Sequence, residues 1–130
     1  MKDSFVNYNE KYIDKQAVKI TALLNKVLDN ILSGVALTYW KEKKGFLLEH
    51  LKLYKESVKD KDKRKNFVFL FTVIIKMTKA FGYGDQNVYV DYFPVAEDKK
   101  GDYWLNQVKG IKNPYPGKKI PECGELKKEI

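Results

Sequence analysis

The chain has 130 residues, of which 25 are basic and 17 acidic, giving a formal net charge of +8. A hydrophobic content of 44% excludes a disordered chain, and a single cysteine excludes an internal disulfide. One cysteine and one histidine also supply too few ligands for an ordinary structural zinc site. We predict one domain over residues 1–130, with an N-terminal extension at 1–8, helices at 9–81 and a tail at 82–130.

Three helices are predicted by apolar residues that recur every three or four positions. The first covers residues 9–32 and the second residues 37–58. The third follows Asp60 or Asp62 as its capping residue, and Gly82 is typical of the position just after a helix. Because the third helix is apolar on almost every side, we expect it to be the most buried.

The last third of the chain differs in composition, since it contains all four prolines and most of the glycines. It also carries many aromatic side chains, which supply enough apolar surface to pack against the helices. Residues 88–90 are compatible with a short extended segment, and residues 103–108 with one or two helical turns. The expected fold is mainly α-helical: an up-and-down bundle of three to four helices with an irregular aromatic, Gly/Pro-rich tail packed on it.

The charge pattern argues against a nucleic-acid partner. Arg64 is the only arginine, whereas base and phosphate recognition favour arginine. The lysines alternate with acidic residues, as in residues 59–65, which is typical of a solvated surface. The most apolar stretch, residues 67–75, is far shorter than the roughly 20 residues that span a bilayer. We therefore expect no nucleic acid and no transmembrane segment. The charged start of the chain leads into no apolar export segment, so either the protein is cytosolic or the chain is a mature segment whose targeting sequence is left out.

No catalytic arrangement is found, and we expect that the protein is not an enzyme. Residues 82–84 read Gly-Tyr-Gly but follow a helix, which excludes a dinucleotide-binding loop. His50 lies beside an apolar stripe without an acidic partner, which is typical of a boundary histidine. Cys123 lies between Glu122 and Glu125, which disfavour the thiolate that nucleophilic chemistry requires.

The tail carries a series of motifs in a recognisable order and spacing. The motif residues are Tyr89, Pro94, Trp104, Leu105, Asn113, Pro114, Tyr115, Gly117 and Gly124. In this order the tail resembles a small domain of bacterial cell-envelope proteins that is also found attached to CusB-type copper/silver efflux adaptors. The resemblance covers residues 89–130, and the predicted helices agree with the helical front part of that family. It implies a periplasmic or cell-envelope location.

The resemblance also implies a heavy-metal site, because that family carries thiol and thioether groups in this region. Such ligands suit a soft ion such as Cu(I) or Ag(I). Here Phe93 replaces the family's first cysteine, while Val95 and Ile120 replace its two methionines. Cys123 alone remains, so we expect apolar packing to have replaced a largely lost metal site.

Two functions follow from this reading. The first is a non-catalytic envelope domain without a cofactor, which interacts with an unidentified envelope protein or binds a ligand through its aromatic tail. The alternative is a working Cu(I)- or Ag(I)-binding domain in metal efflux or homeostasis. That domain would use Cys123, with His50 and Met77 as further candidate ligands or a second chain completing the site.

Overall fold

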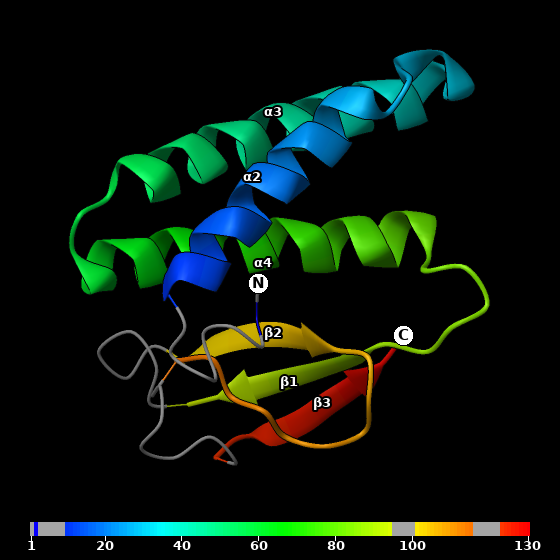
Figure 1. Ribbon diagram of the computed structural model, residues 1–130. Coiled ribbons are helices and arrows are strands. Elements are labelled where there is room, and N and C mark those ends of the chain that lie inside the picture. Colours follow the sequence, from blue (N-terminus) through cyan, green and yellow to red (C-terminus); the bar gives the residue numbers. More distant parts are fainter. Residues whose placement is uncertain (1, 3–9, 95–100, 116–122) are drawn as a thin grey trace.

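The computed structural model describes residues 2, 10–94, 101–115 and 123–130. The helical elements are α2 (Glu10–Lys26), the short 3-10 helix η1 (Asp29–Ile31), α3 (Gly34–Glu56) and α4 (Asp60–Phe81). The strands are β1 (Tyr89–Phe93), β2 (Asp102–Asn106) and β3 (Glu125–Glu129). Figure 1 shows α2 and α3 on one side of α4 and the sheet on the other.

The three predicted helices are present, with shifted ends. The first is shorter than expected, because α2 ends at Lys26 and η1 follows as a separate turn. The second begins at Gly34, three residues before the predicted start. Gly82 follows α4 with a φ of 78°, a left-handed conformation that glycine adopts without strain, as predicted. The predicted caps are wrong, because the N-cap residue of α4 is Lys59 and has no capping side-chain hydrogen bond.

The predicted fold class is wrong, because the tail forms a three-stranded antiparallel sheet in the order β2-β1-β3. Residues 88–90 are extended as expected, but residues 102–106 form β2 instead of helical turns. In the described part of the tail, the glycines and prolines lie outside the strands. Gly101 directly precedes β2 with a φ of 74°, Gly124 directly precedes β3 with a φ of 145°, and Pro94 follows β1. The strands β1 and β2 are rich in aromatic residues, which favour extended structure.

The helix α4 carries more buried side chains than the other described helices, as its apolar pattern predicted, because it lies between α3 and β2 (Figure 1). Its Phe67 and Phe71 rings lie 4.5 Å apart between centroids. Tyr115 continues this row, with its centroid 6.0 Å from Phe67 and 5.8 Å from the fully buried Trp104. Edge-to-face aromatic contacts of this kind stabilise by about 1 kcal/mol each beyond their buried area. The aromatic row therefore joins the sheet to the helices.

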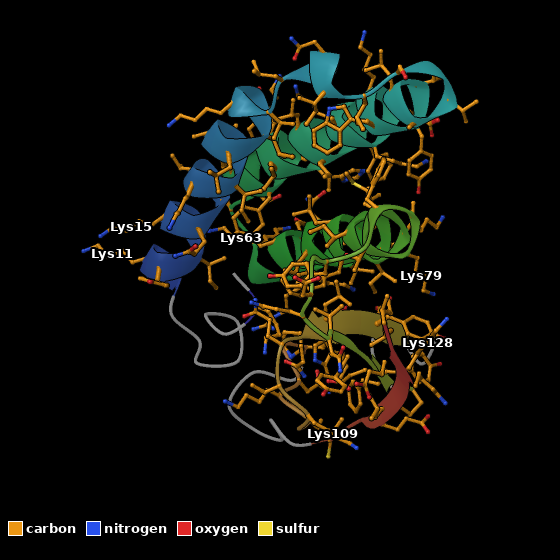
Figure 2. All side chains as sticks on the ribbon, turned by 90° about the vertical axis from the view of Figure 1, so that its right-hand side faces the viewer. Lys11, Lys15, Lys63, Lys79, Lys109 and Lys128 are labelled. Carbon is orange, nitrogen blue, oxygen red and sulfur yellow. The ribbon has the colours of Figure 1, made fainter. Side chains whose placement is uncertain are left out.

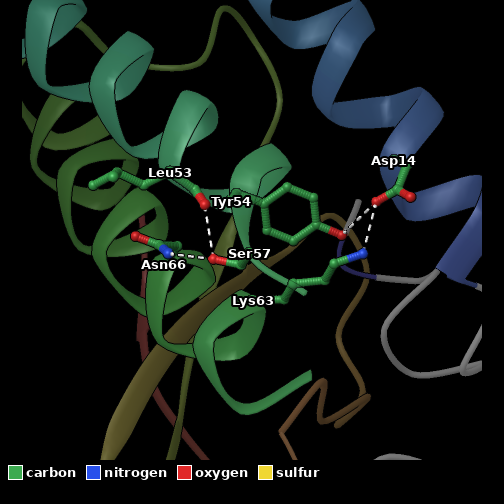
Figure 3. Close-up of polar contacts among 6 residues, drawn as sticks. All are labelled: Asp14, Leu53, Tyr54, Ser57, Lys63 and Asn66. Carbon is green, nitrogen blue, oxygen red and sulfur yellow. Dashed lines mark hydrogen bonds and ion pairs between the residues drawn. The ribbon is translucent and has the colours of Figure 1, made fainter. Parts of the chain in front are cut away.

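A group of polar contacts joins the helices at one end of the helical part (Figure 3). The hydroxyl of the fully buried Tyr54 donates to the carboxylate of Asp14 over 3.2 Å, linking α3 to α2. The Lys63 ammonium of α4 donates to the same oxygen over 3.2 Å. Nearby, the Asn66 amide of α4 donates to the Ser57 hydroxyl over 3.4 Å. These bonds fix how the three helices meet.

The lysines labelled in Figure 2 belong to both the helices and the sheet region. Lys11 and Lys15 project from α2 and Lys79 from α4, whereas Lys109 and Lys128 lie by the sheet. These lysines do not form one stripe. Among the described residues, no helix has the length and apolar character needed to cross a membrane.

Candidate functional site

The candidate metal ligands lie on different elements. Cys123 is exposed and comes just before β3. His50 is half-buried in α3, with its ring centroid 4.8 Å from that of Phe69 and its Nδ1 3.0 Å from the Asn66 Oδ1. Met77 lies on α4 and packs against the core. In the described parts of the chain, no group of three or more His, Cys, Asp and Glu side chains is placed to hold a metal.

Among the positions where this chain replaces a sulfur-containing residue of the related family, the structure describes only Phe93. It lies at the end of β1, half-buried and packed against the hydrophobic core. Val95 and Ile120 lie outside the described residues, as does the motif residue Gly117. Phe93 therefore serves as a packing residue.

Several motif residues of the tail meet around Trp104. Asn113 is fully buried, and its amide donates to the backbone carbonyl of Cys123 over 2.7 Å. Its carbonyl oxygen accepts from the backbone N–H of Tyr115 over 2.9 Å, a local turn that asparagine favours. A Cβ on Gly124 would lie 2.9 Å from the Trp104 ring, so only glycine fits there without displacement. Asn113 and Gly124 thus hold the start of β3 closely against Trp104.

The other described motif residues also have packing positions. Pro114 is buried, and its carbonyl accepts a hydrogen bond from the Arg64 guanidinium of α4. Tyr89 is half-buried at the start of β1, and Pro94 is exposed just after that strand. Leu105 is half-buried in β2 and packs against the core.

The helices form an open apolar hollow of about 440 Å³, which we call the helical hollow. Its wall comes from α2, η1, α3 and α4 and includes Leu24, Ile31, Trp40, Met77 and Phe81. The Trp40 indole N–H donates to the Asp29 carboxylate over 2.9 Å. The Thr78 hydroxyl, also in the wall, donates to a backbone carbonyl of its own helix over 2.9 Å. Both polar side-chain groups of the wall are thus already hydrogen-bonded, and the interior is apolar.

Exposed apolar side chains lie in and next to the elements that form the helical hollow. Ile31 and Phe81 line the helical hollow although 72% and 44% of their surfaces remain exposed. Next to η1, Leu28 is 66% exposed, and Val35 in the first turn of α3 is 87% exposed. The helical hollow therefore lies beside exposed apolar side chains.

A second hollow of about 460 Å³ lies between the helices and the region of β2, and we call it the sheet hollow. It has apolar walls that include Leu51, Leu70 and Leu105. Its polar lining residues are Lys2, Tyr83, Asn106, Gln107 and Lys112. The two hollows share three aliphatic residues, which are Ile20, Leu47 and Ile74.

Hydrogen bonds organise the polar part of the sheet hollow. The Gln107 amide donates to the Tyr83 hydroxyl over 2.7 Å. The Lys2 ammonium donates to the Asn106 side chain, whose amide donates to the Asp91 carboxylate. Asp91 is only 1% exposed, and this burial raises the pKa of its carboxyl, although the Asn106 hydrogen bond and the Lys2 charge act in the opposite direction.

Residues 1–86 match a protein family described as "Protein of unknown function (DUF3347)". The chain belongs to the DUF3347 family. The matched region includes α2, η1, α3 and α4, and with them every lining residue of the helical hollow. Comparisons with curated proteins and with solved structures found no significant match. Because the DUF3347 description assigns no activity, the envelope and metal-binding relationship implied by the tail stays a prediction.

Sequence reasoning did not find the two hollows of this DUF3347 chain. The residues that form them, such as Leu24, Ile74 and Met77, carry the same periodic signal as any core residue. Leu28 and Ile31 were predicted to lie within the first helix, but α2 ends at Lys26 and both side chains are exposed. Their exposure became apparent only in the folded structure.

Proposed function

We propose that this DUF3347 chain is a non-catalytic ligand-binding module of the cell envelope, whose helical hollow takes up the apolar part of a small ligand. The hollow itself carries the proposal. Its volume of about 440 Å³ falls in the range of about 300–1,000 Å³ that is usual for small-molecule sites. The cell-envelope location rests on the resemblance of the tail and is part of the same proposal.

The chemistry of the wall supports an apolar occupant. Apolar cavities bind water poorly and take up apolar molecules, because water inside would lose its hydrogen bonds. Burying an alkyl group stabilises the complex by roughly 25 cal/mol for each Å² of apolar surface removed from water. The exposed side chains of Ile31 and Phe81 give such a molecule an apolar entrance.

A fluorescent apolar probe tests this proposal directly. N-phenyl-1-naphthylamine, excited without exciting tryptophan, should bind saturably with an increase in emission, and decanol should displace it. Leu24 lines the hollow, whereas the neighbouring Leu23 is 54% exposed and does not line it. Leu24→Trp should therefore weaken probe binding at least about tenfold, while Leu23→Trp leaves it unchanged. Absence of saturable binding to the native protein, or equal binding by both variants, would contradict the proposal.

A second candidate function is soft-metal binding by Cys123, which the exposure of this thiol favours. One thiolate needs further ligands for tight Cu(I) or Ag(I) binding, and a second chain would have to supply them. An anaerobic Cu(I) titration against a chromogenic chelator, with Cys123→Ser in parallel, tests this candidate. Competition that disappears in the variant would support it. Equal competition by both proteins, or none by either, would remove it.

A further inference from the structure

The two hollows share an aliphatic wall. Ile20, Leu47 and Ile74 line both of them, from α2, α3 and α4 respectively. Leu47 is buried, while Ile20 and Ile74 are only partly buried. Aliphatic side chains change rotamer without breaking hydrogen bonds, so this wall can admit an alkyl chain from one hollow to the other.

The sheet hollow adds a cation and a hydroxyl donor that the helical hollow lacks. Lys112 is exposed on its rim and, in the parts of the chain that the structure describes, forms no ion pair. The Tyr83 hydroxyl accepts its hydrogen bond from Gln107, which leaves its own proton for an acceptor in the hollow. An ammonium and a hydroxyl donor together suit a carboxylate, because charge-assisted hydrogen bonds are the strong ones.

We propose that the two hollows together bind a single-chain carboxylate amphiphile, that is, a fatty acid. The alkyl chain passes the Ile74 side of the shared wall into the helical hollow, and the carboxylate lies at Lys112 and Tyr83. The net charge of +8 on the chain favours the approach of such an anion. This inference rests on the proposed function and adds the head group of the ligand and its orientation.

Head-group competition tests the inference. Dodecanoate, dodecanol and dodecyltrimethylammonium, each below its micelle concentration, compete for bound N-phenyl-1-naphthylamine. Dodecanoate should bind most tightly. Lys112→Gln should weaken the binding of dodecanoate about tenfold, which is the effect of one charged hydrogen bond. The affinity for dodecanol should stay unchanged. Lys109→Gln is the matched control, because Lys109 is an exposed lysine near β2 that does not line the sheet hollow.

Chain length tests whether the ligand occupies both hollows. From octanoate to dodecanoate the affinity should rise about fourfold for each added CH₂, since each buried CH₂ contributes about 0.8 kcal/mol. If the affinity stops increasing beyond octanoate, the alkyl chain does not extend from one hollow into the other, and this part of the inference is overturned. Equal binding of dodecanoate and dodecanol, or no effect of Lys112→Gln, would overturn the carboxylate site while the proposed apolar site stands. Failure of the probe to bind at all would instead overturn the proposed function.

Discussion

Removal of the Tyr54 hydroxyl is the sharpest test of how the helices are joined (Figure 3). In Tyr54→Phe, the fully buried ring stays in place, while the hydroxyl and its 3.2 Å hydrogen bond to the Asp14 carboxylate are lost. The remaining partner of that carboxylate is Lys63, whose ammonium also lies 5.5 Å from the Tyr54 ring. The variant therefore removes a hydrogen bond between α2 and α3.

The expected loss follows from the surroundings of Asp14. A hydrogen bond to a charged group stabilises a protein by about 1.5–3 kcal/mol. The Asp14 side chain is 53% exposed, so water replaces part of the lost bond, and Lys63 still neutralises the charge. We expect Tyr54→Phe to lower the free energy of unfolding by about 1 kcal/mol, equivalent to about 4 °C in the melting temperature.

Urea unfolding followed by circular dichroism measures this loss. Tyr103→Phe is the matched control, because the Tyr103 ring is 47% exposed and removal of its hydroxyl should change stability by less than about 0.5 kcal/mol. A double-mutant cycle with Asp14→Ala, which removes the acceptor, should give a coupling energy of at least about 0.5 kcal/mol. If the losses of the two single variants simply add, the Tyr54–Asp14 bond contributes nothing and the reasoning is wrong.

Two further predictions concern glycines at positive φ and the buried carboxyl of Asp91. Gly82→Ala and Gly124→Ala both place a Cβ at positive φ, but only the latter approaches other atoms, at 2.9 Å from the Trp104 ring. We expect Gly82→Ala to lower the free energy of unfolding by about 1 kcal/mol, and Gly124→Ala to lower it by at least about 1 kcal/mol more. Equal losses of the two variants in urea unfolding would contradict the close packing at Gly124. Burial raises the pKa of Asp91 in the folded state above its ordinary value of 3.8, so its contribution to stability falls as pH rises through the folded-state pKa. The stability of Asp91→Asn relative to the native protein should therefore increase from pH 4 to pH 7, and a constant difference would refute a raised pKa.

The helices were predictable because each is long enough to show its period. The helix α4 has 22 residues, and its apolar side chains on several sides correctly indicated burial against more than one layer. The strands have five residues each, too few for a clear alternation. Their pairing is also non-local, since Tyr89 pairs with Glu129, and no property of either segment alone specifies that partner. The glycines and prolines around the strands were therefore mistaken for signs of an irregular tail.

The candidate site was also predictable only in part. The order of the tail motifs singled out Asn113, Trp104 and Gly124, and the structure brings these residues together in one packed unit. Whether this unit descends from a metal site stays a prediction. The helical and sheet hollows had no signature in the chain, because their lining residues are ordinary core residues of the predicted stripes.

The amino-acid sequence by itself determined the three helices, their apolar faces and the aromatic residues that join the tail to them. These features depend on residues a few positions apart, whose side chains share a face through the geometry of the helix alone. Only the tertiary structure decided the sheet order, the burial of Asp91 and the two hollows that share Ile20, Leu47 and Ile74. A hollow is the space that side chains from several elements leave unfilled, so its size depends on how those elements pack against one another.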